Sequence, residues 1–234
     1  MRLCSALALA ALSILTASAR GQDRPEESCT AQWLRSASPA DRVRANAFGK
    51  TCILQGQSAP RALTRLELTP MLERAVPADS ALARSVPPDA GAFCPRYAAL
   101  TRSDRATFWR ELLFQIMGHE SDYRPAVMYW EGTEYSVGLL QMSLSNGCVA
   151  REQDLIDPLA NIDCAVKRMT RLVARQGRPV GRIGGDLQHG RQGAAAYWST
   201  LRVQAAKPPG AARDTRGPIL TATRALSACR HPSR

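Results

Sequence analysis

The sequence predicts a mainly helical α+β fold, a helical body with one small β-hairpin that is stapled by disulfides. Three observations predict it. Apolar residues recur at three- and four-residue steps over two long segments, residues 104–120 and 158–173. Strand-forming residues gather in one place, residues 126–142, around a Glu131-Gly132 turn. Six of the seven cysteines lie beyond a leader-like N-terminus, and an even number in an exported chain is typical of disulfides.

Residues 1–19 are predicted to be a secretory signal peptide. They contain one early cation, Arg2, then an apolar run and a small-residue Ala-Ser-Ala end. The apolar run is too short for a membrane span. We therefore expect a periplasmic or secreted protein of a Gram-negative bacterium, with no stable membrane insertion after the signal is cleaved.

The rest of the chain is expected to fall into three parts. Residues 20–92 read as a helical extension, with one pattern running to Leu54, followed by a linker whose five prolines limit helix length. Residues 93–205 form the body. Residues 206–234 are a basic tail with a short helix from Pro218 to Cys229.

The charge of the chain does not by itself define a partner. Thirty-one Lys and Arg residues against twenty Asp and Glu residues give a formal net charge of +11, which attracts anionic polymers. The arginines are spread along the chain and are not interleaved with aromatic residues, so a solvated surface is favoured and no nucleic-acid partner is expected. No metal or cofactor is expected, because the histidines are scattered and His119-Glu120 has Tyr123 where a zinc motif needs its second histidine.

Glu120 has an unusual position for a glutamate, on the apolar face of a predicted helix. The helix that it ends has one apolar face, made by Phe108, Trp109, Leu112, Leu113, Ile116 and Met117. Glu120 follows Ile116 by four residues and so lies on that same face. Burial and the negative end of the helix dipole both raise the pKa of a carboxyl group there, as a general acid requires. The alternative is a frayed helix end with a solvated side chain.

Three further segments follow in order. The first is Ser136-Val137-Gly138-Leu139-Leu140-Gln141. The second is a helix with Asp157 as N-cap and Pro158 in its first turn, which carries Asn161-Ile162. The third is Ala195-Ala196-Tyr197, within a helix expected over residues 191–202. Together with Glu120-Ser121, their order and spacing resemble the lytic transglycosylase (SLT-type) domain, over about residues 93–205.

This resemblance implies a goose-type-lysozyme-like fold with the hairpin beside an active-site cleft. It also implies cleavage of the β-1,4 bond between N-acetylmuramic acid and N-acetylglucosamine in peptidoglycan, with 1,6-anhydromuramyl ends as product. Glu120 matches the catalytic acid/base, and peptidoglycan glycan strands would be the partner of a protein expected to be a monomer. The residues that match the substrate-binding positions are Ser136, Gly138, Leu140, Gln141, Asn161 and Tyr197.

Some points stay open at this stage. Many members follow the tyrosine with Asn-Ala-Gly, whereas this chain has Trp198-Ser199-Thr200, so Trp198 either stacks on a sugar or lies in the core. Ser121 either orients the carboxyl group or closes the helix. If Glu131 or Glu134 faces the cleft, hydrolysis becomes an alternative. A non-catalytic peptidoglycan-binding protein is the third reading.

The expected disulfides are Cys29–Cys52, Cys94–Cys229 and Cys148–Cys164, one of many pairings that six cysteines allow. The first would clip the N-terminal helices together. The second would staple the two ends of the body, and the third would tie the cleft to the Asn161 helix.

Overall fold

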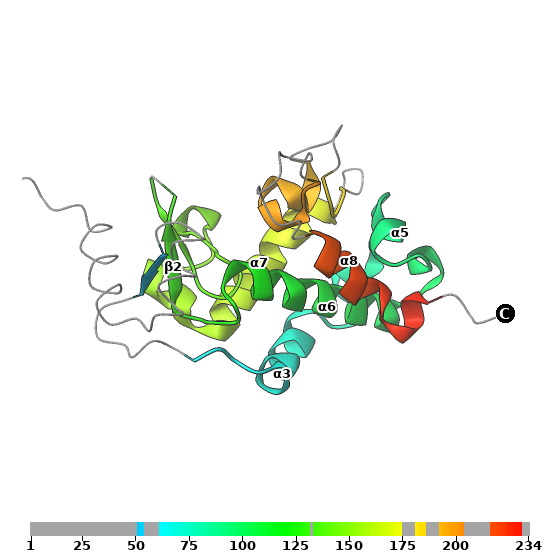
Figure 1. Cartoon of the computed structure of the whole chain (residues 1–234), viewed down its shortest axis with the longest axis horizontal. Coiled ribbons are helices and arrows are strands. Elements are labelled where there is room, and N and C mark those ends of the chain that lie inside the picture. The colour runs from blue at the N-terminus through cyan, green and yellow to red at the C-terminus, as the bar shows by residue number, and fades with distance from the viewer. Residues whose placement is uncertain are drawn as a thin grey trace, which may run out of the picture.

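The computed structural model describes residues 51–53, 61–131, 133–174, 181–185, 192–203 and 216–230. The signal peptide and Cys29 lie outside them. Helix α6 (Arg102–Glu120) runs through the middle of the molecule, with the hairpin near one end and helix α8 (Arg216–Arg224) toward the other (Figure 1). The described part is mainly helical with one small antiparallel sheet, which confirms the predicted α+β class.

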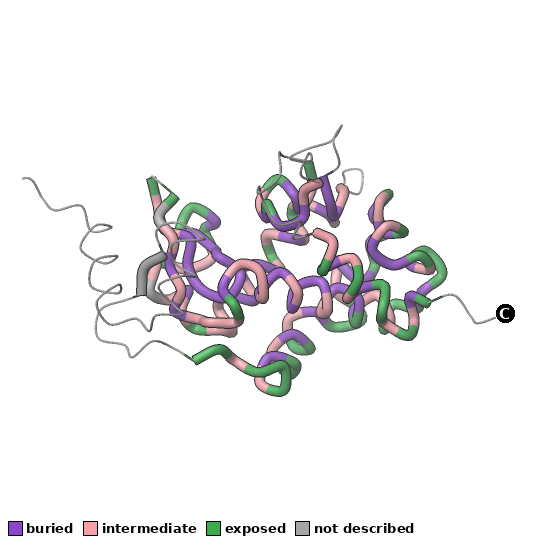
Figure 2. The backbone as a smooth tube through the Cα atoms, viewed as in Figure 1, coloured by how far each residue is buried: buried purple, intermediate pink, exposed green. Residues whose placement is uncertain are grey.

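Helix α6 is the centre of the hydrophobic core. Its six predicted core residues are all fully buried, and Figure 2 shows this buried run in the middle of the molecule. The helix begins two residues earlier than the Ser103-Asp104 pair would place it, because Thr101 is the N-cap and its hydroxyl accepts a 3.2 Å bond from the Asp104 nitrogen.

The sheet has three strands in the order β1-β2-β3, all antiparallel. The predicted hairpin is confirmed as β2 (Val127–Trp130) and β3 (Tyr135–Val137), closed by a 2.9 Å bond from the Glu131 nitrogen to the Glu134 carbonyl oxygen. Strand β1 (Thr51–Ile53) adds to the other edge of β2. The helix expected to reach Leu54 is therefore wrong for these three residues, since pairing with β2 overrides their local preference.

The predicted boundary near residue 92 is not a boundary in the packing. Helices α3 (Arg65–Ala75), α4 (Ala81–Arg84) and α5 (Ala90–Phe93) each bury apolar side chains in the same core as α6. The carboxylate of Asp89, in the segment expected to separate domains, accepts bonds of 2.9 and 2.8 Å from the backbone nitrogens of residues 183 and 184. The prolines keep these helices short but do not prevent their burial.

Helix α7 (Pro158–Val173) begins as predicted, with the Asp157 carboxylate accepting a 2.8 Å bond from the Ala160 nitrogen. The helix expected over residues 191–202 is wrong: this segment forms two 3-10 turns, η4 (Gly193–Ala196) and η5 (Ser199–Leu201). Gly193 has a φ of 56° and lies so close to the Arg182 carbonyl that a Cβ would be 1.9 Å from its oxygen. A right-handed helix requires a negative φ, so a regular helix cannot run through Gly193.

The remaining short elements connect the longer ones. They are the 3-10 turns η1 (Tyr97–Ala99), η2 (Leu144–Asn146), η3 (Glu152–Ile156) and η6 (Ser227–Cys229). Together with α8, η6 confirms the short helical tail predicted from Pro218 to Cys229.

Two of the three expected disulfides are confirmed. Cys94 bonds to Cys229, which joins the end of α5 to the C-terminal turn η6, and Cys148 bonds to Cys164 of α7. Disulfides of this kind fit an extracytoplasmic protein. Among the helices of the described residues, none combines the length and the apolar character that crossing a membrane requires.

Candidate active site

Glu120 is the last residue of α6, and its half-buried side chain is contacted by the turn η5. The Thr200 hydroxyl, from η5, donates a 3.2 Å hydrogen bond to Oε1. Burial raises the pKa of Glu120 from 4.5 to about 7, while the Thr200 bond lowers it, the Glu131 charge raises it and the Arg202 charge lowers it. A carboxyl group with this pKa carries its proton in a large fraction of molecules near neutral pH, which is what a general acid needs.

The backbone turns sharply after Glu120. Asp122 and Tyr123 have positive φ angles of 53° and 61°, which non-glycine residues seldom adopt. The Tyr123 side chain folds back over Gly118, where a Cβ would lie 2.6 Å from its hydroxyl. Ser121 donates to the carbonyls of Met117 at 3.1 Å and Leu139 at 3.0 Å, so it closes the helix and ties it to the next segment.

That next segment is a tight turn over residues 138–142. Gly138 has a φ of 80°, and a Cβ there would lie 2.3 Å from the Asn161 amide nitrogen. Gln141 also has a positive φ, 49°, and its side-chain nitrogen donates to the carbonyls of Gly138 at 2.8 Å and Val127 at 3.2 Å. The amide of Gln141 thus holds the turn to β2.

Asn161 is fully buried and holds the same turn from the side of α7. Its Oδ1 accepts a 2.9 Å bond from the Leu140 nitrogen, and its Nδ2 donates to the carbonyls of Val137 at 2.8 Å and Leu155 at 2.9 Å. Leu140 is fully buried as well. Asn161, Leu140 and the largely buried Gln141 therefore position the turn, and their contact with substrate stays a prediction.

Tyr197 also contacts this turn. Its hydroxyl donates to the Gln141 carbonyl at 2.9 Å and accepts a bond from Asn146 at 3.0 Å. The hydrogen bond to Glu120 comes instead from Thr200, three residues later. The indole nitrogen of Trp198 donates to the Leu140 carbonyl at 3.1 Å and the side chain is buried, so Trp198 is a core residue.

The two glutamates of the hairpin have different hydrogen-bond partners. The Glu131 carboxylate accepts a 3.1 Å bond from Ser136, and its charge is felt at Glu120. Glu134 accepts bonds of 3.1 and 2.7 Å from the backbone nitrogen and hydroxyl of Ser145, in η2. Of the two hairpin carboxylates, Glu131 is the one whose charge acts on Glu120.

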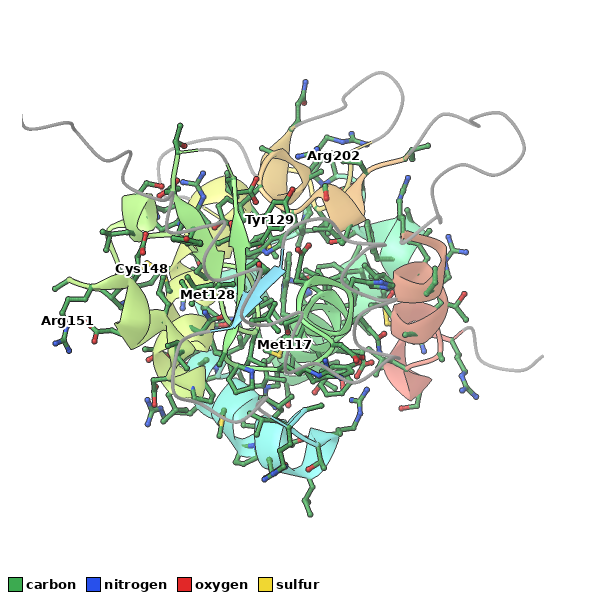
Figure 3. The ribbon with its side chains drawn as sticks, turned by 60° about the vertical axis from the view of Figure 1, so that its left-hand side comes forward. Met117, Met128, Tyr129, Cys148, Arg151 and Arg202 are labelled. Atoms are coloured by element: carbon green, nitrogen blue, oxygen red, sulfur yellow. A yellow bond between two sulfur atoms is a disulfide. The ribbon has the colours of Figure 1, made fainter. Side chains whose placement is uncertain are left out.

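The sequence did not predict a role for Thr200 or Arg202. Arg202 donates through Nε to the Ala195 carbonyl at 2.8 Å and through Nη2 to the Ala196 carbonyl at 3.3 Å; Figure 3 labels it on the segment that follows η5. The departure from Asn-Ala-Gly marks the place of Thr200, but no spacing connects it to a residue eighty positions earlier. Within the described ranges, no group of three or more His, Cys, Asp or Glu residues could hold a metal ion.

Fold and site together define an α+β protein with a protonatable carboxyl group enclosed at the end of its central helix and a second carboxylate on the adjoining hairpin. No family model matches the chain, and no curated protein matches it. It is similar in structure to Bd0314 DslA, a Bdellovibrio protein. The match to its wild-type form 2 has a TM-score of 0.60 and 26% identity, and it covers 74% of this chain and 100% of that one.

Two mutants of Bd0314 DslA, each named for one glutamate replaced by glutamine, match in the same way. Their TM-scores are 0.56 and 0.57, both at 28% identity, and each match covers 70% of this chain and 90% of that chain. The likeness therefore extends over most of the length of that protein.

Proposed function

We propose that this protein cleaves the glycan strands of peptidoglycan at the β-1,4 bond between N-acetylmuramic acid and N-acetylglucosamine. Glu120 is the acid that protonates the oxygen of the bond that breaks. The observation that supports this most directly is the enclosed carboxyl group at the end of an apolar helix, with its pKa raised to about 7. The order of motifs around it, which resembles lytic transglycosylases, supports peptidoglycan as the substrate.

In the first form of the reaction, Glu120 works alone. Its proton goes to the glycosidic oxygen, and the substrate's own N-acetyl oxygen stabilises the positive charge that develops at the sugar. The Glu120 carboxylate then removes the proton from the 6-hydroxyl, which attacks the anomeric carbon and leaves a 1,6-anhydromuramyl end. This lytic reaction is what the motif resemblance implies.

A second form, hydrolysis, is favoured by Glu131. Hydrolytic glycosidases use two carboxyl groups, one protonated and one ionised. The Glu131 charge acts on Glu120, and this supports Glu131 as the second carboxyl group. The two glutamates replaced in the Bd0314 DslA mutants are eleven positions apart, as are Glu120 and Glu131. In this form the Glu131 carboxylate activates the attacking water.

Digestion of purified sacculi separates these chemistries. The wild-type chain is compared with Glu120→Gln and Glu131→Gln, with Glu134→Gln as the matched hairpin control, and the released fragments are weighed by mass spectrometry. Anhydro ends that disappear only with Glu120→Gln indicate the lytic reaction. Reducing ends that disappear with both Glu120→Gln and Glu131→Gln indicate hydrolysis. Binding without release by the wild-type chain would contradict cleavage and leave a peptidoglycan-binding protein.

A further inference from the structure

We propose that Thr200 is a positioning residue for Glu120: its hydroxyl holds Oε1, so that the transferable proton is carried on Oε2. The effect of Thr200 on catalysis rests on the proposed function, whereas the hydrogen bond itself does not. No sequence motif of the chain assigns Thr200 a role.

The hydrogen bond between Thr200 and Glu120 determines which carboxyl oxygen carries the proton. The Thr200 hydroxyl lies 3.2 Å from Oε1 and donates to it. An oxygen that accepts this bond cannot at the same time direct its own proton along the same line, since two hydrogens would then meet. The acid proton is therefore favoured on Oε2. When Glu120 ionises, the same hydroxyl stabilises the carboxylate, so one bond serves both the acid and the base form.

Residues on either side of Thr200 are held by burial and hydrogen bonds. The side chains of Trp198 and Leu201 are buried and Thr200 is itself only 7% exposed. The indole of Trp198 is bonded to the Leu140 carbonyl, and the Leu201 nitrogen is bonded to the Trp198 carbonyl at 3.1 Å. This segment therefore presents the hydroxyl to Glu120 at low cost in conformational entropy.

Thr200 occupies a position at which the resembled motif has a different residue. Many lytic transglycosylase domains have glycine at the third position after the tyrosine, and glycine has no hydroxyl to donate. Here that position is Thr200, while the Tyr197 hydroxyl is bonded to Gln141 and Asn146. In this chain the side chain that contacts the carboxyl group comes from η5.

Charged groups near Glu120 act on its carboxyl group independently of the Thr200 hydrogen bond. Glu131 on the hairpin and Arg202 after η5 act on the carboxyl group with opposite signs. Along the chain, His119 precedes Glu120, and Asp122 follows it with Arg124 at 3.6 Å. Thr200 is uncharged, so its replacement changes the hydrogen bond and leaves these charges in place.

The test uses the full mature chain labelled with carbon-13, in which the Glu120 carboxyl signal is followed through a pH titration. Thr200→Val and Thr200→Ala both remove the hydroxyl, so one remains if the other folds poorly, and Thr200→Ser keeps it. The matched control is Thr223→Val, since Thr223 is a fully buried threonine away from Glu120, and its hydroxyl donates to the Phe93 carbonyl at 2.8 Å.

Loss of the Thr200 hydroxyl is expected to raise the titration midpoint of Glu120 by up to about one pH unit, the shift expected for one hydrogen bond to the ionised form. Release of fragments from sacculi should fall roughly ten-fold, and its basic limb should move upward with the midpoint. Thr200→Ser should restore both, and Thr223→Val should leave both unchanged.

An unchanged midpoint in the two hydroxyl-free variants, or an equal shift in Thr223→Val, would overturn the inference. The result is independent of the proposed function, which Glu120→Gln tests by itself. If Glu120→Gln releases fragments as fast as the wild-type chain, the proposed function fails while the titration still reports on Thr200.

Discussion

The side-chain oxygen of Asn161 accepts a 2.9 Å hydrogen bond from the backbone nitrogen of Leu140. This bond joins two segments that are twenty-one residues apart in the sequence, and the amide nitrogen of Asn161 adds bonds to Val137 and Leu155. A single buried amide thus holds the turn that follows β3 against α7. The candidate active site depends on this turn, because Ser121, next to Glu120, is bonded to the Leu139 carbonyl within it.

Replacement of Asn161 by alanine should lower the free energy of unfolding by about 2–4 kcal/mol, because it leaves buried backbone groups without partners. Urea denaturation measures the loss. Asp163→Ala is the control on the same helix, since the Asp163 side chain is 41% exposed and pairs with Arg74 at 3.6 Å. It should change stability by less than about 0.5 kcal/mol. Equal losses in both variants would contradict the role given to Asn161.

Two glycines with similar backbone angles should respond differently to alanine. A Cβ on Gly138 would lie 2.3 Å from the Asn161 amide, whereas nothing lies within 4 Å of one on Gly147, whose φ is 66°. Gly147→Ala should cost only the backbone strain, about 1 kcal/mol. Gly138→Ala should cost more than about 3 kcal/mol and disturb the turn. Thermal unfolding of the two variants side by side tests this difference.

Stability should fall as the pH rises from about 4.5 to 7. Glu120 is ionised above 4.5 in the unfolded chain but only above about 7 in the folded one, so the folded state binds more protons in this window. Glu120→Gln removes the effect, and its stability relative to wild type should grow with pH up to about 3 kcal/mol at most, since solvent screens part of the effect at a half-buried side chain. Urea unfolding at pH 4 and pH 8 compares the two. A constant difference would show that burial does not raise this pKa.

The two charges near Glu120 should shift its titration in opposite directions. Glu131→Gln removes a negative charge and should lower the pKa of Glu120, whereas Arg202→Gln removes a positive charge and should raise it. Arg202→Lys keeps the charge while it loses the bonds to Ala195 and Ala196, so it serves as the control for Arg202→Gln. The carboxyl carbon-13 titration gives all three midpoints, and shifts of the same sign would contradict this arrangement of charges.

The two disulfides should differ in their contribution to stability. Cys94–Cys229 closes a separation of 135 residues and Cys148–Cys164 one of 16. In the chain-entropy account, their removal costs about 5 and about 3 kcal/mol. Each pair is replaced by two serines, which avoids a free thiol, and unfolding is measured without reductant. A larger loss for the shorter separation would show that packing of α7, rather than chain entropy, dominates.

The local sequence pattern alone was sufficient to predict several of the helices and strands. The apolar face of α6, the cap of α7 at Asp157 and the hairpin around Glu131 all follow from residues within one or two turns of each other. The same pattern placed Glu120 at the end of the buried face. The Cys94–Cys229 and Cys148–Cys164 pairings were among many that six cysteines allow and fitted the resembled fold, and the structure confirms them.

Only the tertiary structure decided what the polar side chains do. Asn161 and Gln141 read from the sequence as residues that contact a glycan, yet their amides are bonded to backbone groups. The segment expected as a helix at residues 191–202 forms two turns, of which η4 packs against Arg182 and η5 presents Thr200 to Glu120. A periodic pattern reports which face of an element is buried, but not which distant segment covers that face. That choice depends on packing between segments far apart in sequence.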